Sequence, residues 1–89
     1  MFEEENIEKE FQDSIRYVNN LDSNIKFDFL KMYGLYKQAL FGDNEIEKPW
    51  FFYVKSNNKW LVWKNNYGKS KLDAKKEYIL KVEEIKFFE

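Results

Sequence analysis

Apolar residues recur every three or four positions in this 89-residue chain, and this spacing constrains the fold more than any other feature. In the first part of the chain, Ile7, Phe11, Ile15 and Val18 follow one another at steps of four, four and three. Such residues share one face of an amphipathic helix, and the acidic residues between them lie on its outer side. No segment reads as a convincing strand, so the sequence predicts an all-α fold.

Similar patterns and helix-end signals predict four helices, over residues 3–19, 26–41, 55–67 and 71–87. The polar stretch at residues 19–24 predicts a turn that supplies Ser23 or Asn24 as the N-cap of the second helix. Gly42 is placed to end that helix in a left-handed conformation, which costs glycine little. Gly68 closes the third helix, and Ser70 is the expected N-cap of the fourth.

We expect each later helix to present one inner face, listed here in chain order: Phe29, Tyr33, Tyr36 and Leu40, with Met32 beside them; Trp60, Trp63 and Tyr67; Ala74, Tyr78, Val82 and Ile85. Residues 42–54 contain the only proline and have no sustained helical period, so they predict a long loop between the second and third helices. The apolar run from Trp50 to Tyr53 is expected to pack back and seal one end of the core. The long loop lets the middle helices cross at an angle and leave a bowl between them.

The chain contains neither cysteine nor histidine. It therefore lacks the usual general base, the Ser-His and Cys-His nucleophile pairs, and the nitrogen and sulfur ligands of zinc sites. Carboxylate pairs such as Glu83 and Glu84 lie in charged runs on predicted helix exteriors, where the sequence offers no apolar walls that would shift the pKa of a carboxyl group. The sequence thus predicts a protein that is not an enzyme, with no catalytic residues, no metal and no cofactor.

No run approaches the ~18 consecutive apolar residues of a membrane span, and the N-terminal sequence MFEEEN is acidic where a signal peptide is basic. The absence of cysteine favours a reducing compartment. We therefore expect residues 1–89 to form one cytoplasmic, monomeric domain.

Charge is unevenly distributed, since residues 53–76 carry seven lysines against Asp73 alone. This asymmetry indicates an anionic partner. The stretch KWLVWK at residues 59–64 alternates basic and aromatic residues, as nucleic-acid-binding surfaces do. A small helical nucleic-acid-binding module that uses residues 53–76 is therefore the alternative function, although the pI of about 5.6 argues against it.

The stretch YGLYKQALFGD at residues 33–43 carries a family resemblance. It resembles the tyrosine-x-x-tyrosine-lysine-glutamine-alanine signature of the acyl-CoA-binding proteins, with the glycine and aspartate that follow it. The resemblance extends from Phe11 to Ile85 and includes further residues in order: Pro49, Lys59, Trp60, Trp63, Ser70, Asp73, Ala74, Tyr78, Ile79 and Val82.

The resemblance implies a four-helix bundle that holds an acyl-CoA across its bowl, and a carrier of medium- to long-chain acyl-CoA that buffers these esters or delivers them to acyl-CoA-using enzymes of lipid metabolism. It implies that Tyr33, Tyr36 and Lys37 meet the adenosine and its 3′-phosphate. Lys59 is then a second phosphate ligand and Lys55 a peripheral contact. Tyr78 contributes a contact from the fourth helix, and Phe29 lines the acyl tunnel.

Two segments differ from the family pattern. The loop at residues 19–25 is one residue shorter, and it places Asn19 and Asn20 where the family often has a lysine that faces phosphate. Trp50, Phe51 and Phe52 are bulkier than their family counterparts. We expect this aromatic run, together with Phe29, to form the walls at the end of the tunnel.

Overall fold

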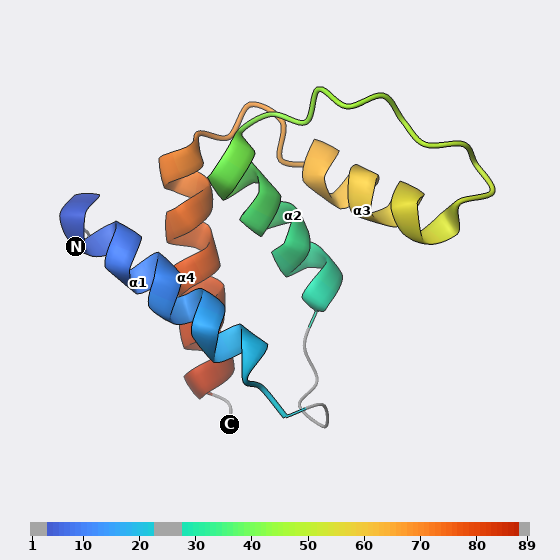
Figure 1. The fold of residues 1–89 in the computed structure, drawn as a ribbon. Coiled ribbons are helices and arrows are strands. Elements are labelled where there is room, and N and C mark those ends of the chain that lie inside the picture. Colours follow the sequence, from blue (N-terminus) through green and yellow to red (C-terminus); the bar gives the residue numbers. More distant parts are fainter. Residues whose placement is uncertain (1–3, 23–27, 88–89) are drawn as a thin grey trace.

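The computed structural model describes residues 4–22 and 28–87 and confirms the predicted all-α fold (Figure 1). Its helices are α1 (Glu4–Asn19), α2 (Phe29–Phe41), α3 (Val54–Lys64) and α4 (Lys71–Phe87). The proposed caps Ser23 and Asn24 lie outside the described residues. Within these ranges, every helix falls short of the length or the apolar character that a membrane span requires.

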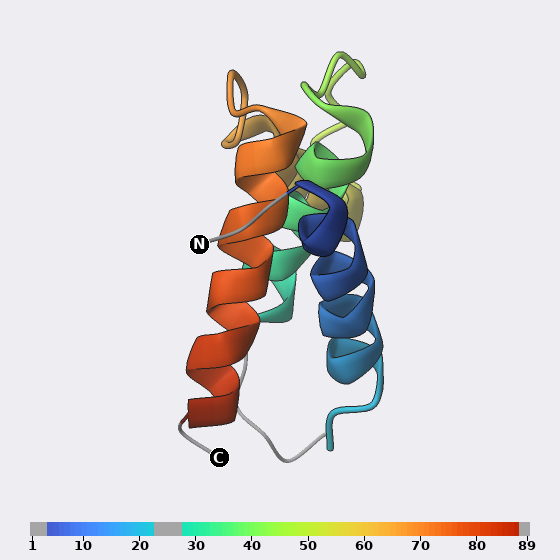
Figure 2. The ribbon, with the colours of Figure 1, turned by 90° about the vertical axis from the view of Figure 1, so that its left-hand side faces the viewer.

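The helices form a flat assembly of 39 × 32 × 16 Å. Helices α1 and α4 lie side by side and run in the same direction, whereas α2 runs in the opposite direction (Figures 1 and 2). Helix α2 packs against both α3 and α4, and α1 packs against α4. Helix α2 is therefore the element that joins α3 to the rest of the fold.

The core lies between α1, α2 and α4. Its buried members are Ile7 and Phe11 of α1, Met32, Leu35 and Ala39 of α2, and Ala74, Tyr78, Ile79 and Val82 of α4. The inner face predicted for the first helix is confirmed, and so are the buried positions Ala74, Tyr78 and Val82 of the fourth. Helix α3 contributes only Trp63 to the buried hydrophobic residues of the described chain.

The inner face predicted for α2 is wrong by part of a turn. The buried residues are Met32, Leu35 and Ala39, together with the small Gly34 and the polar Gln38, and the predicted aromatic residues lie beside them. Gly34 is buried because the backbone of α3 crosses here, so that a Cβ atom at position 34 would lie 2.7 Å from the carbonyl carbon of Val62. This close approach displaces the larger rings to the edges of the helix.

Two predicted helix ends are confirmed, but the end of the third helix is not, because α3 ends at Lys64 with Asn65 as its C-cap and Gly68 lies in the turn that follows. Gly42 has a φ of 77° and follows the last residue of α2, as expected. The hydroxyl oxygen of Ser70 accepts a 3.0 Å hydrogen bond from the amide of Asp73, which confirms the cap of α4. Helix α2 begins after Asp28, whose carboxylate accepts a 3.0 Å bond from the amide of Lys31. Asp28 is therefore the cap of α2.

Hydrogen bonds tie the first part of the long connection to α3. The fully buried Asn44 donates through its side chain to the carbonyl of Trp60, at 3.1 Å. The indole of Trp60 donates to the carbonyl of Ile46 at 2.6 Å, and the indole of Trp63 donates to that of Gly42 at 2.8 Å. These bonds hold the connection and α3 together as one unit.

The aromatic run does not seal the core. The side chains from Trp50 to Tyr53 are all exposed, and their rings pack against one another. The prediction of a packed loop is wrong because Asn44 and the two indoles of α3 already hold the connection in place. In α3 itself, Trp63 is buried and Trp60 is half-buried, whereas Tyr67 is exposed beyond the end of the helix.

Candidate functional site

Tyr33 lies where two pockets meet, because it lines both of them. Its place on the edge of α2, beside the buried face, leaves one side of the ring toward α1 and α4 and the other toward α3. The opening between α2 and α3 is the bowl that the long connection predicts. A second opening, on the other side of Tyr33, was not predicted.

The opening between α1, α2 and α4, called here the tyrosine pocket, has a volume of about 330 Å³. Three tyrosines and several apolar side chains form its walls, and the only other polar side chain is an amide. The lining residues are Ile15, Val18, Asn19, Phe29, Met32, Tyr33, Tyr36 and Tyr78. Such a surface suits a flat ring or a hydrocarbon chain, since it offers apolar area and a few hydroxyl groups.

The opening between α2, the long connection and α3, called here the lysine pocket, has a volume of about 220 Å³. It joins two lysines to apolar and aromatic walls. The lining residues are Tyr33, Lys37, Ile46, Pro49, Ser56, Lys59, Trp60 and Trp63. The two lysines come from different helices, so the crossing of α2 and α3 brings them together.

Both ammonium groups of the lysine pocket lie near the ring of Tyr33. The distance from Nζ to the ring centroid is 5.8 Å for Lys37 and 5.4 Å for Lys59. Lys37 is also 4.7 Å from the ring of Phe41 and 5.3 Å from that of Trp63. Cation–π attraction therefore holds the ammonium group of Lys37 among three rings.

Among the described residues, no ion pair involves Lys37 or Lys59. Two cations beside one aromatic face can bind a phosphate and stack an aromatic base at the same time. The pocket is thus suited to a nucleotide-like anion.

Tyr78 is the buried tyrosine of the site, with 3 % of its surface exposed. Its ring meets Phe11 edge to face, with 5.3 Å between the centroids. Burial raises the pKa of the Tyr78 phenol to about 12, and the nearby Tyr36 adds to the shift. At neutral pH the phenol is therefore uncharged and able to donate a hydrogen bond from the floor of the tyrosine pocket.

This burial predicts a loss of stability in alkali. Because the unfolded chain releases the Tyr78 proton near its ordinary pKa of 10.0 and the folded chain only near 12, stability falls as the pH rises from about 10 to 12. Between pH 8 and pH 11, the wild type is expected to lose about 1 kcal/mol more than Tyr78→Phe, measured by urea unfolding. Comparison with Tyr78→Phe cancels the titration of the other tyrosines and lysines. Equal losses would show that the folded phenol titrates normally.

The structure brings most of the predicted site residues together. Tyr33, Tyr36, Tyr78 and Phe29 line the tyrosine pocket, although Phe29 is half exposed, and Lys37 and Lys59 line the lysine pocket with Tyr33. The exception among the predicted residues is Lys55, which is exposed one turn before Lys59 and lines neither pocket.

Sequence reasoning missed two of the rings around Lys37. Phe41 was not assigned a role, although it lies one helical turn after Lys37 and this spacing could have revealed it. Trp63 was assigned to the core alone, yet it also lines the lysine pocket. The run from Trp50 to Tyr53 lines neither pocket, so it does not form the predicted walls.

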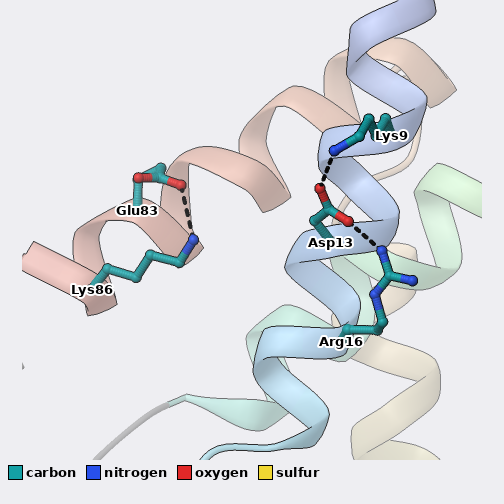
Figure 3. A network of polar contacts seen from close by, with 5 residues as sticks. All are labelled: Lys9, Asp13, Arg16, Glu83 and Lys86. Carbon is teal, nitrogen blue, oxygen red and sulfur yellow. Dashed lines mark hydrogen bonds and ion pairs between the residues drawn. The ribbon is translucent and has the colours of Figure 1, made fainter.

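Exposed or partly exposed carboxylates on α1 and α4 are paired with neighbouring cations (Figure 3). Asp13 accepts from Lys9 at 3.0 Å and also pairs with Arg16, and these bonds lower the pKa of Asp13. Glu83 pairs with Lys86 at 3.4 Å. Such exposed pairs contribute little to stability. In the described part of the chain, no group of acidic residues is arranged to hold a metal ion.

Comparisons with known proteins agree with this geometry. The family model described as "Acyl CoA binding protein" matches residues 8–82. The acyl-CoA-binding protein of Saccharomyces cerevisiae is 45% identical over 76 residues, which are 84% of this chain and 87% of the yeast protein. Acyl-CoA-binding protein homolog 1 of Caenorhabditis elegans is 40% identical over 76 residues, which are 84% of this chain and 88% of the nematode protein. The crystal structure of Oryza sativa acyl-CoA-binding protein 2 superposes with a TM-score of 0.86 at 36% identity, covering 93% of this chain and 91% of the rice chain.

Proposed function

The chain belongs to the acyl-CoA-binding protein family, and from this premise we propose that it is a carrier of medium- to long-chain acyl-CoA esters. One observation carries the proposal: a basic pocket and a largely apolar pocket meet at the ring of Tyr33. A CoA ester has both kinds of surface, since its head carries phosphates and an adenine while its tail is hydrocarbon.

The head of the ligand binds across Tyr33. Lys37 and Lys59 bind phosphate oxygens, one from each side of the α2–α3 crossing, and the adenosine lies against Tyr33 and Tyr36. Tyr78 donates a hydrogen bond to the ligand from the floor of the tyrosine pocket. Both ammonium groups lie near the ring of Tyr33, and the three tyrosines line one pocket, which supports these roles.

The acyl chain lies along the apolar side chains of the two pockets. Phe29 offers a half-exposed ring at the start of α2, and Ile46 and Pro49 offer apolar area on the long connection. Lys55, one turn before Lys59, contacts the ligand from the rim.

The carrier performs no chemistry on its ligand. It shields the chain from water, buffers the ester in the cytoplasm and passes it to acyl-CoA-using enzymes through transient contacts. The ion-paired carboxylate of Asp13 on α1 and the lack of histidine and cysteine support a binding role without catalysis. The alternative of a nucleic-acid-binding module gains no support from the comparisons, which all point to acyl-CoA-binding proteins.

A chain-length series tests the proposal. Calorimetric titration with free CoA and with esters from butanoyl-CoA to stearoyl-CoA is expected to show affinity rising by at most ~0.8 kcal/mol per buried methylene, then a plateau where the apolar surface ends. Free CoA binds far more weakly, because the head alone must offset the cost of association.

Two controls complete this test. In Phe29→Ala the gain from lengthening the chain should be smaller, while the affinity of free CoA is unchanged. A DNA duplex titrated at two salt concentrations should show no binding; tight, steeply salt-dependent duplex binding would instead favour the nucleic-acid module. Flat affinity across the series would mean that the tail stays in water.

A further inference from the structure

The turn that leads into α3 carries four consecutive aromatic residues that neither the core nor the pockets use. Trp50, Phe51, Phe52 and Tyr53, called here the aromatic turn, are 70, 84, 56 and 55% exposed. Their rings contact one another, with centroid distances of 6.0 Å for Trp50 and Phe52, 5.5 Å for Phe51 and Phe52, and 4.6 Å for Phe52 and Tyr53. A contiguous exposed aromatic patch on so small a domain marks an interaction surface.

Hydrogen bonds within the turn fix its backbone. The amide of Tyr53 donates to the carbonyl of Trp50 at 3.0 Å. The side chain of Asn57 donates to the same carbonyl at 2.5 Å and to that of Tyr53 at 3.0 Å. These carbonyls are thus satisfied without water, which lowers the cost of moving the turn into a less polar medium.

Lysines flank the aromatic turn on both sides, with Glu47 also preceding it in the connection. Helix α3 carries Lys55, Lys59 and Lys64 and no acidic residue, and Lys48 lies just before the turn. Both Lys48 and Lys55 are exposed. Aromatic side chains flanked by lysines are the combination that favours the interface of a lipid bilayer with anionic headgroups.

The aromatic turn also lies at an extremity of the molecule. Figure 1 shows the long connection reaching out beyond α3, away from α1 and α4, before the chain returns. The turn can therefore meet a flat surface without a clash from the core helices. Pro49 and Ser56, which flank the turn, both line the lysine pocket.

We propose that the aromatic turn docks this protein on membranes that contain anionic lipids. The rings of Trp50 and Phe51 enter the interfacial layer, and Lys48 and Lys55 lie against the headgroups. Docking places the rim of the lysine pocket at the lipid surface. Apart from Lys55 at the rim, this surface is separate from the residues that bind the CoA head, and its test needs no acyl-CoA.

The full chain without ligand is tested by co-sedimentation with two kinds of vesicle, phosphatidylcholine alone and phosphatidylcholine with about a third phosphatidylserine. The wild type is expected to bind the phosphatidylserine vesicles more tightly and to lose binding as salt rises. Phe51→Ser should reduce partitioning about tenfold or more, because one buried ring is removed. Phe87→Ser is the matched control, since Phe87 is 81% exposed at the end of α4 and should leave partitioning unchanged.

Three results would overturn the proposal. The first is absence of wild-type binding to either kind of vesicle, and the second is equal binding to both. The third is unchanged binding by Phe51→Ser, which would move the contact elsewhere. Analytical ultracentrifugation adds a check: self-association abolished by Phe51→Ser, without vesicle binding, would show that a second copy covers the turn. Thermal unfolding should give the same midpoint for Phe51→Ser and wild type, because this ring lies outside the core.

Discussion

The double variant Lys37→Ala/Lys59→Ala is expected to bind acyl-CoA at least about a hundredfold more weakly than the wild type, with little change in the free energy of unfolding. A hydrogen bond to a charged group contributes ~1.5–3 kcal/mol, and two such groups are removed. Stability should change little because neither ammonium group forms an ion pair in the described chain. Calorimetry with palmitoyl-CoA and urea unfolding measure the two quantities.

The variant Lys9→Ala/Lys86→Ala controls for net charge, because it also removes two positive charges, from exposed positions on α1 and α4 (Figure 3). This variant should bind like the wild type. Because Lys37 and Lys59 approach the same ring, the losses of binding free energy in the two single variants should not sum to the loss in the double variant. Equal affinity for the two double variants would show that the phosphates bind elsewhere.

Replacing Gly34 by alanine is expected to weaken both the fold and the site. The new methyl group would overlap the backbone of α3 at Val62, and such overpacking costs about 1–3 kcal/mol. The better helix propensity of alanine offsets at most ~1 kcal/mol of this. Relief of the overlap moves α3 away from α2, so Lys59 moves away from Lys37 and affinity for acyl-CoA falls.

Gly68→Ala separates these two effects. Gly68 has a φ of 90°, and a Cβ atom there meets no atom within 4 Å, so alanine strains the local backbone without touching a helix. We expect it to lower stability by about 1–2 kcal/mol and to leave affinity unchanged. Denaturation and calorimetry on both variants give the comparison. A Gly34→Ala protein with full stability and full affinity would contradict the role given to this contact.

The sequence predicted the helices best where one face of a helix meets the core. Phe11 and Val82 fit this case, and periodicity alone identified them as buried. In α2 the same reasoning assigned the aromatic residues to the buried face, because it favours the larger and more apolar side chains. Burial there instead follows the close approach of the α3 backbone at Gly34, and at Gln38 it accompanies hydrogen bonds from the side-chain amide to Asp43 and to the carbonyl of Lys69.

The site was predictable in its members but not in its geometry. The resemblance to a family implied roles for Tyr33, Lys37 and Lys59, and these residues do lie together. That two lysines from different helices approach one ring depends on how α3 crosses α2, and no local pattern encodes that crossing. The exposure of Phe51 was equally unpredictable, because composition cannot distinguish a ring that packs inside from one held outward by a turn.

The attachment of α3 to α2 alone has a consequence for dynamics. Detachment of α3 with its connection leaves the three-helix core intact, so this unit can open at a lower free energy than global unfolding requires. A ligand that bridges Lys37 and Lys59 spans the hinge of that opening. The proposed ligand therefore stabilises the closed arrangement by mass action. Its rate of release is coupled to the rate at which α3 detaches from α2.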